Sequence, residues 1–408
     1  MNPSSQTNIH PDRHDSLADC SHENLSALRK QFAALLADLN NEGDALADEV
    51  VHDCQQVPGE TRSLLTLGMS QGVAAIPRAP ESFRRFLAQA ESSAAGVSTE
   101  ELALASEPYL LMGPMWITVS LGPGSLVHTY ADPGIAAVLM STGNLSDTGA
   151  ARRLLETQIW NLRILRSGGL RQGGQGYVQT LQVRLLHARV RKTLMDRGWT
   201  DDAHAVPINQ AQMIRTWLDF TLVGFRALQK IGFEFSADDQ APIYLMWRLV
   251  GELLGIDSRL LSLLQDAQSA GVLLDTMDAA SPAPNEHSRL LTRAMLNAVG
   301  TRLARVWGMP QDMAILFTES LSRAFHGEVM ARQLGLSANW TEALLPVYAD
   351  ANRYRHLRAK QDPVFRRELF DRSLGAFDAI EGSLKGGTSF EHVDSHLSAG
   401  SKLPEIKV

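Results

Sequence analysis

Apolar side chains recur at helical spacing along most of this 408-residue chain, and this periodicity restricts the fold more than any other feature. Residues 24–39 repeat leucine and phenylalanine every three or four positions, and the segment 81–90 follows Pro80, as a helix start should. Further amphipathic segments follow at 147–167, 178–197, 207–230, 238–254, 258–275, 287–306, 310–334 and 363–380. The stretch 116–127 has a strand-like composition, but one strand makes no sheet. The sequence therefore predicts an all-α protein.

The two ends of the chain differ from the rest. Residues 1–23 are polar and residues 383–408 begin in a glycine-containing stretch, so we expect a flexible tail at each end. Residues 24–382 contain no internal repeat, and the helices that flank the Pro-Ala-Pro loop at 282–284 resemble one another. We therefore expect residues 24–382 to form a single large helical domain.

Composition limits the classes of function. The net charge is −7 and the pI about 6.0, so no global basic field favours nucleic acid. The only cysteines, Cys20 and Cys54, leave no disulfide framework to build. The N-terminus lacks the apolar core of a signal peptide, and no run of 18 apolar residues predicts a transmembrane segment. We expect a cytoplasmic protein.

One histidine, His187, stands between two arginines on a predicted helix. Arg184 precedes it by three residues and Arg191 follows it by four, so the three side chains share one face. An imidazole is a good axial ligand for iron, and guanidiniums are good partners for carboxylates such as haem propionates. The alternative is a buried histidine, held by a hydrogen bond within a salt-bridged helix. This stretch alone leaves both interpretations open.

A second polar face lies about thirty residues upstream. Arg153, Glu156 and Thr157 share one side of an otherwise apolar helix, and buried polar groups need partners. They would form a ligand cavity if they faced the His187 helix, or local salt bridges if Glu156 bonded Arg152 or Arg153. The loop 167–176 between the helices is rich in glycine but lacks the ending of a phosphate-binding loop. We expect it to be a flexible connector that lets the two helices pack closely.

Other candidate sites are weaker. Glu49 and His52 have the spacing of a helical di-iron ligand pair, but no second copy of the pair exists. His326 lies on an apolar helix and is expected in the core, whereas His128 has a polar neighbourhood and could line a pocket. No zinc-helix motif and no nucleophile elbow is present.

Taken in order, these residues resemble those of the latex clearing protein rubber oxygenases and their relatives, which include the fungal membrane-bound oxygenases of mycophenolic acid synthesis. Arg153, Thr157 and His187 match the family's arginine, threonine and haem-ligating histidine. The further matches are Gly198-Trp199, 206–210, Thr216, Phe220 and 244–255. The resembling core runs from about Gly113 to Gly255, which is about a third of the chain.

The resemblance implies a globin-like helical core that holds haem b. It makes His187 the proximal iron ligand, while Arg184 and Arg191 hold its surroundings or the propionates. Arg153 and Thr157 would polarise the opposite, distal side, where dioxygen reacts. Family members cleave carbon–carbon double bonds of polyisoprenoids with dioxygen.

The chain departs from the family in two places. Glu156 stands where the rubber oxygenases characteristically have a lysine, and the apolar stretch 134–139 replaces a segment in which they carry an acid. We hypothesise that Glu156 takes over the role of the lysine or of the acid, with Asp132 the weaker candidate. These differences, and the missing export signal, argue against rubber and for a small isoprenoid or lipid-like substrate.

The sequence therefore predicts a haem-dependent dioxygenase with dioxygen and a hydrophobic small molecule as its substrates. Two alternatives stay open. One is a haem-binding sensor or carrier without oxygenase turnover, and the other is a haem-free helical interaction protein in which His187 is a core residue.

Overall fold

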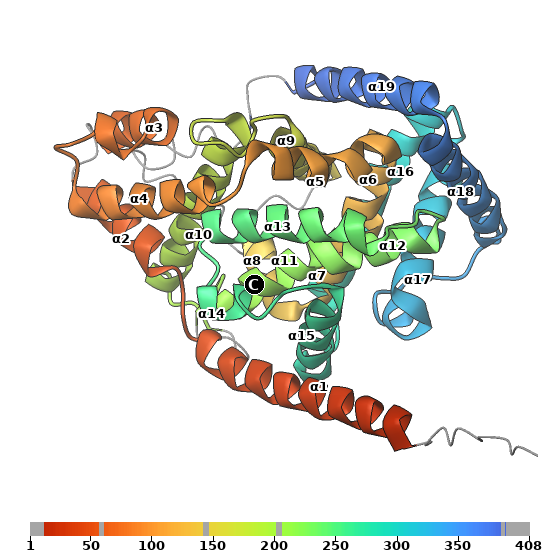
Figure 1. Cartoon of the computed structure of the whole chain (residues 1–408), viewed down its shortest axis with the longest axis horizontal. Coiled ribbons are helices and arrows are strands. Elements are labelled where there is room, and N and C mark those ends of the chain that lie inside the picture. The colour runs from red at the N-terminus through yellow and green to blue at the C-terminus, as the bar shows by residue number, and fades with distance from the viewer. Residues whose placement is uncertain (1–11, 57–60, 142–146, 201–205, 385–387, 389–408) are drawn as a thin grey trace, which may run out of the picture.

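The computed structural model describes residues 12–56, 61–141, 147–200, 206–384 and 388, and no β-strand occurs among them (Figure 1). The helices are α1 (Asp12–Leu39), α2 (Ala45–Gln56), α3 (Thr61–Gln71), η1 (Val73–Ala75), α4 (Glu81–Ala95), α5 (Thr99–Met112), α6 (Pro114–Val119), η2 (Ser120–Leu126), α7 (Val127–Ala131), α8 (Pro133–Ser141), α9 (Asp147–Leu165), α10 (Gln175–Asp196), α11 (Gln210–Leu218), η3 (Asp219–Val223), α12 (Gly224–Lys230), α13 (Ala237–Leu253), α14 (Ser258–Leu261), α15 (Ala267–Ala280), α16 (Glu286–Trp307), α17 (Gln311–Gln333), η4 (Trp340–Leu344), α18 (Leu345–Gln361) and α19 (Pro363–Gly382). The predicted all-α class is confirmed.

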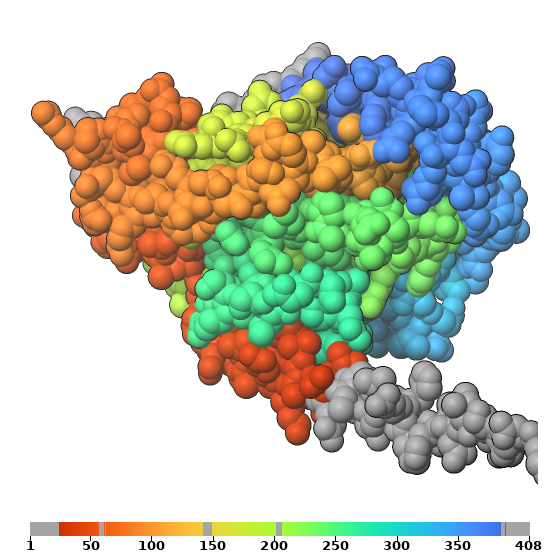
Figure 2. All heavy atoms as spheres, in the orientation of Figure 1, coloured from red at the N-terminus to blue at the C-terminus, as the bar shows by residue number. Residues whose placement is uncertain are grey.

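Helices α5 and α13 lie side by side and form adjacent bands on one face of the molecule (Figure 2). Each begins at a serine that forms a capping box, Ser98 for α5 and Ser236 for α13. Beneath them the fully buried Trp247 lies against Trp160 of α9 and Phe220 of η3, with ring centroids 6.2 and 5.7 Å away. This aromatic group ties α9, η3 and α13 together in the core.

The stretch with strand-like composition is helical. It forms α6 and then η2, a π-helical segment that contains Pro123, and η2 packs against a second π-helical segment, η3. Residues 116–131 are all buried, so packing on every side overrides the β-preference of the branched residues at the start of the stretch. π-Helical turns are rare and occur most often beside functional sites.

The ends of the chain differ in part from the expected tails. Helix α1 begins at Asp12 rather than at residue 24, so it takes in half of the N-terminal segment. At the other end Thr388 is buried, and its hydroxyl accepts a hydrogen bond of 3.1 Å from Gln179 of α10. The rest of the predicted tails, 1–11, 385–387 and 389–408, lies outside the described residues.

Among the described residues no single helix is long and apolar enough to cross a membrane. Residues Thr99–Met112 and Pro114–Ala131 pass together by length and composition, but they meet at an angle of 94°. Most of their side chains are buried in the core of this protein.

Candidate functional site

Helices α9 and α10 form a hairpin whose glycines allow very close contact. A Cβ atom on Gly169 would lie 2.0 Å from the carbonyl oxygen of Arg163, and one on Gly176 would lie 2.8 Å from the same oxygen. Only glycine fits at these two positions without moving the backbone. The prediction that the glycine loop lets the two helices pack closely is confirmed.

The predicted distal and proximal residues lie at corresponding heights on this hairpin. The indole Nε1 of Trp160 donates a 3.0 Å hydrogen bond to Oγ1 of Thr180, and Gly176 lies against the last turn of α9, so the helices run in opposite directions. Arg153 lies seven residues before Trp160, and His187 lies seven residues after Thr180. Both steps are about two helical turns along the hairpin, away from its loop.

His187 has an imidazole that the protein leaves uncommitted. Neither ring nitrogen hydrogen-bonds within the described part of the chain, and Nδ1 is buried. Burial, followed by the positive charge of Arg191, lowers the pKa of His187 to about 4, so the ring is neutral at pH 7. A neutral imidazole with a free nitrogen is the form that ligates iron. The alternative of a histidine held by a hydrogen bond does not match these contacts.

The two flanking arginines have carboxylate partners on the segment that leads into α2 and on α2 itself. Nε and Nη2 of Arg184 lie 2.5 and 3.0 Å from the carboxylate oxygens of Asp44, and Nη1 donates to Gln89 at 2.6 Å. Arg191 bonds Asp48 at 2.9–3.1 Å and the carbonyl oxygen of Ile208 at 2.6 Å. Of the two roles implied by the resemblance, these contacts favour holding the surroundings of His187 over binding propionates.

Several residues that carried the resemblance stabilise the region around the Arg184–Asp44 pair, called the corner below. Nε2 of Gln210 donates to the carbonyl oxygens of Gly43 and Gly255, at 3.0 and 2.9 Å. Gly255 has a φ of +76°, and a Cβ there would lie 2.2 Å from Asp44 and 2.4 Å from Arg184. The corner therefore needs a glycine at this position, for backbone conformation and for space.

On α9, the three predicted distal residues lie in different environments. The Glu156 side chain is 6% exposed, and its Oε1 lies 2.9 Å from Nε of Arg152, which is half exposed. Arg153 contacts the hydroxyl of Tyr130 on α7. Burial raises the pKa of Tyr130, and the charge and hydrogen bond of Arg153 partly offset this rise. Thr157 is partly buried. The local salt bridge foreseen for Glu156 is present, and Arg153 points to α7.

Asp132 has a structural role. Its Oδ1 accepts a 2.9 Å hydrogen bond from the backbone N–H of Ile135 and so caps α8. Its Oδ2 lies 3.9 Å from Nε of Arg215. The apolar stretch 134–139 lies within α8.

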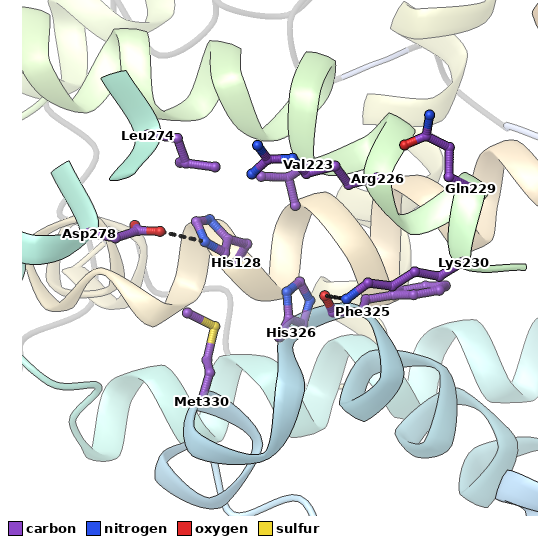
Figure 3. Close-up of a pocket in the computed structure, with 10 residues that line it drawn as sticks. All are labelled: His128, Val223, Arg226, Gln229, Lys230, Leu274, Asp278, Phe325, His326 and Met330. Atoms are coloured by element: carbon purple, nitrogen blue, oxygen red, sulfur yellow. Dashed lines mark hydrogen bonds and ion pairs between the residues drawn. The ribbon is translucent and has the colours of Figure 1, made fainter. Parts of the chain in front are cut away.

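A second polar cluster surrounds His128, which the sequence suggested only as a pocket residue (Figure 3). Its Nδ1 lies 2.7 Å from Oδ1 of Asp219 in η3, and its Nε2 lies 3.6 Å from Oδ2 of Asp278 in α15. Burial alone would lower the pKa of His128, but the charge and hydrogen bond of Asp219, aided by Asp278, raise it to about 9. His128 is therefore charged at pH 7.

His326, the other ring in this cluster, is neutral. Its centroid lies 5.7 Å from that of His128, and its Nε2 lies 2.8 Å from the carbonyl oxygen of Pro123. Burial and the charge of His128 lower its pKa to about 3. His326 is only partly buried and lines the pocket beside His128, so the expected core position holds only in part. The signal for this cluster was Asp219, an acid within an apolar helix.

The residues of the hairpin fit a haem iron on its proximal side. The donor is a neutral, uncommitted imidazole, and the helix that carries it is fixed by two buried arginines. Glu49, considered above as half of a di-iron pair, forms an ion pair with Arg85. His187 therefore offers a neutral nitrogen that could ligate an iron.

The comparisons with known proteins agree with this fold. The chain resembles a solved structure described as latex clearing protein in the closed state, with a TM-score of 0.63 and 17% sequence identity over 78% of this chain and 84% of the other. At this identity the likeness shows the fold alone. No curated protein matches the chain.

A family model covers more of the chain than the resemblance did. Residues 103–357 match the catalytic domain of the family described as ER-bound oxygenase mpaB/B'/Rubber oxygenase. The match contains the whole of the 113–255 core and continues through α16 and α17 into α18. More than half of the chain is thus the oxygenase catalytic domain, and the protein belongs to the mpaB and rubber oxygenase family.

Proposed function

We propose that this oxygenase uses haem b, and that it oxidises or cleaves a carbon–carbon double bond of a hydrophobic, isoprenoid or lipid-like small molecule with dioxygen. The observation that carries the proposal is the neutral imidazole of His187, which has no hydrogen-bond partner among the described residues and lies at a height on the hairpin that corresponds to that of Arg153. When bound, haem iron supplies the activation of dioxygen that no amino-acid side chain can provide.

The residues of the chain would divide the remaining work. His187 holds the cofactor, and the Arg184–Asp44 and Arg191–Asp48 pairs fix the helix that carries it. Arg153 and Thr157 supply hydrogen-bond donors on the opposite side. The apolar α8 gives an unsaturated chain a surface free of charge, which suits a hydrophobic substrate.

Absorption spectroscopy with a hemin titration tests the cofactor. We expect the purified protein, alone or after hemin addition, to show a Soret band that His187→Ala removes. The matched control is His356→Ala, because His356 also has a buried nitrogen without a hydrogen-bond partner among the described residues but lies on α18. A protein that refuses hemin, or a Soret band equally strong in His187→Ala, would overturn the proposal.

A haem-binding protein without turnover is the second candidate. One observation favours it: Glu156, at the position of the family's lysine, is committed to Arg152. Oxygen consumption with farnesol as the unsaturated probe separates the two, since only an oxygenase consumes oxygen in proportion to added alkene.

The proposal includes a cytoplasmic location, which rests on the sequence and is tested by cell fractionation.

A further inference from the structure

A cavity of about 490 Å³ lies beside α7, within the size range of small-molecule sites. Figure 3 shows its lining side chains converging from α7, from η3 and α12, from α15 and from α17. The polar lining residues are His128, Arg226, Gln229, Lys230, Asp278 and His326, and the apolar ones are Val223, Leu274, Phe325 and Met330.

The cavity and the contact with Arg153 lie on different sides of α7. His128 lines the cavity, whereas Tyr130, two residues later, contacts Arg153. Residues two apart on a helix point to different sides. The cavity and the proposed haem face are therefore separate sites that share one short helix.

The charges around the cavity leave an excess of positive charge. The negative charge of Asp219 offsets the positive charge of His128. The negative charge of Asp278 is offset by Arg215, which lies 2.9 Å away. Arg226 has no ion pair among the described residues, and its charge lowers the pKa of Lys230, after burial, which is the larger cause. Two cationic side chains, Arg226 and Lys230, thus face the cavity without an anion.

Two N–H donors in the cavity are poorly satisfied or only partly used. Nε2 of His128 lies 3.6 Å from Asp278, too far for a strong hydrogen bond, although the ring is only 5% exposed. The ammonium of Lys230 donates to the carbonyl oxygens of Ala324 and Phe325, at 2.9 and 2.8 Å, and keeps its third hydrogen. Lys230 is exposed, whereas His128 is buried, and a buried charged donor without a good acceptor is costly unless a ligand supplies one.

The shape of α17 creates this arrangement. Gly327, at φ +80° and ψ 170°, breaks the helix just after His326. Carbonyl groups before a helix end lack helical partners, and those of Ala324 and Phe325 are free to hold Lys230. Only glycine adopts this conformation readily. The break therefore positions Lys230, His326 and Met330 around the same space.

We propose that this cavity is a binding site for a small organic anion, a carboxylate with a short apolar tail. The carboxylate would bind between Arg226, Lys230 and Nε2 of His128, and the tail would pack on the apolar lining. A metal ion suits the site poorly, because no three His, Cys, Asp or Glu of the described residues are grouped to hold one.

Calorimetric titration of the full chain with octanoate at pH 7 tests the proposal. We expect saturable binding, weaker binding of 1-octanol, which lacks the charge, and weaker binding of inorganic phosphate, which lacks the tail. Equal affinity for either probe would overturn the assignment of a carboxylate with an apolar tail, as would the absence of saturable octanoate binding.

Two substitutions with opposite expected signs locate the binding. Arg226→Gln should weaken octanoate binding about fivefold, as for loss of one exposed ion pair. Asp278→Asn should tighten it about twofold or more, because it removes a competing carboxylate from His128. The charge-matched control is Arg367→Gln on α19, which should leave the affinity unchanged. An unchanged affinity in Arg226→Gln, or a weakened one in folded Asp278→Asn, would contradict the site.

The binding site is independent of the proposed cofactor. Octanoate binding should persist in His187→Ala, and loss of binding there would place the ligand at the hairpin instead. If Asp278→Asn fails to fold because Arg215 loses its partner, octanoate binding by Arg226→Gln still tests the proposal, since Arg226 is exposed. The affinity should also fall above about pH 9, where His128 loses its proton.

Discussion

Arg184 and Asp44 form a two-point ion pair, with Nε and Nη2 of the arginine 2.5 and 3.0 Å from the two carboxylate oxygens of the aspartate. The pair joins α10 to the turn before α2 across 140 residues of sequence. The guanidinium also lies 4.8 Å from the ring centre of Phe86. Since α10 carries His187, this pair fixes the position of the proposed iron ligand.

Arg184→Met should lower the free energy of unfolding by about 3–5 kcal/mol, because it leaves the carboxylate of Asp44 buried without its partner. Urea denaturation at pH 7 measures the change. The control is Arg367→Met, which removes an exposed arginine paired with Asp371 and should change stability by less than about 0.5 kcal/mol. A small effect in Arg184→Met would mean that the pair does not hold the corner.

Gly255→Ala should destabilise the protein by about 2 kcal/mol or more, since it forces a side chain into positive φ and against Asp44 and Arg184. Gly375→Ala should do the reverse. It lies within α19, no atom is within 4 Å of an added Cβ, and alanine favours a helix by about 0.5–1 kcal/mol. Thermal unfolding of both variants checks the contrast. Equal effects of the two substitutions would refute the close contact at Gly255.

Stability should fall as the pH rises from about 6.5 to above 9. His128 has a pKa of about 9 in the folded protein, whereas an unfolded histidine titrates near 6.5. The folded state thus holds the proton more tightly, and its stabilisation is complete below pH 6.5 and disappears as the pH passes 9. The expected loss is about 2–3 kcal/mol. Urea titrations at pH 6.5 and 9.5 give the difference, and His128→Gln should remove it, whereas a slope that survives in this variant would assign it to other groups.

Glu156→Gln should alter the Soret band or lower alkene-dependent oxygen consumption about tenfold or more, if Glu156 replaces the family's lysine or acid. Arg152→Gln removes the ion-pair partner and leaves the carboxylate in place. A change in Glu156→Gln that Arg152→Gln does not reproduce would assign the effect to the carboxylate itself. Unchanged spectrum and turnover in Glu156→Gln would sink this role.

The sequence predicted most of the long helices of this protein because they are amphipathic and local, but it missed α5 and α18. The helical spacing of apolar residues can be recognised without knowing distant contacts. The glycines at 167–176 likewise indicated close packing of the two flanking helices from local sequence alone. The length of α1 was missed, since its first half is polar and carries no apolar periodicity. The strand-like stretch at 116–127 misled for the opposite reason, because complete burial overrides local preference.

The site was predicted less completely because its partners are far apart in the sequence. Nothing near Arg184 identifies Asp44 as its partner, and Asp219 lies 91 residues from His128. Without these contacts, the arginines were open to propionates and His128 was merely a pocket residue. The local pair of Glu156 and Arg152, one helical turn apart, was foreseen as one of two possibilities.

The corner at Gln210 and Gly255 also affects how relatives of this protein can be detected. Gln210 donates hydrogen bonds to backbone carbonyl groups, and Gly255 leaves room for an ion pair, and neither contact depends on which molecule is oxidised. A search pattern built on them would collect chains that share the scaffold. Sorting those chains by substrate would require the side chains of α8 and α9 instead, where we propose that the substrate binds.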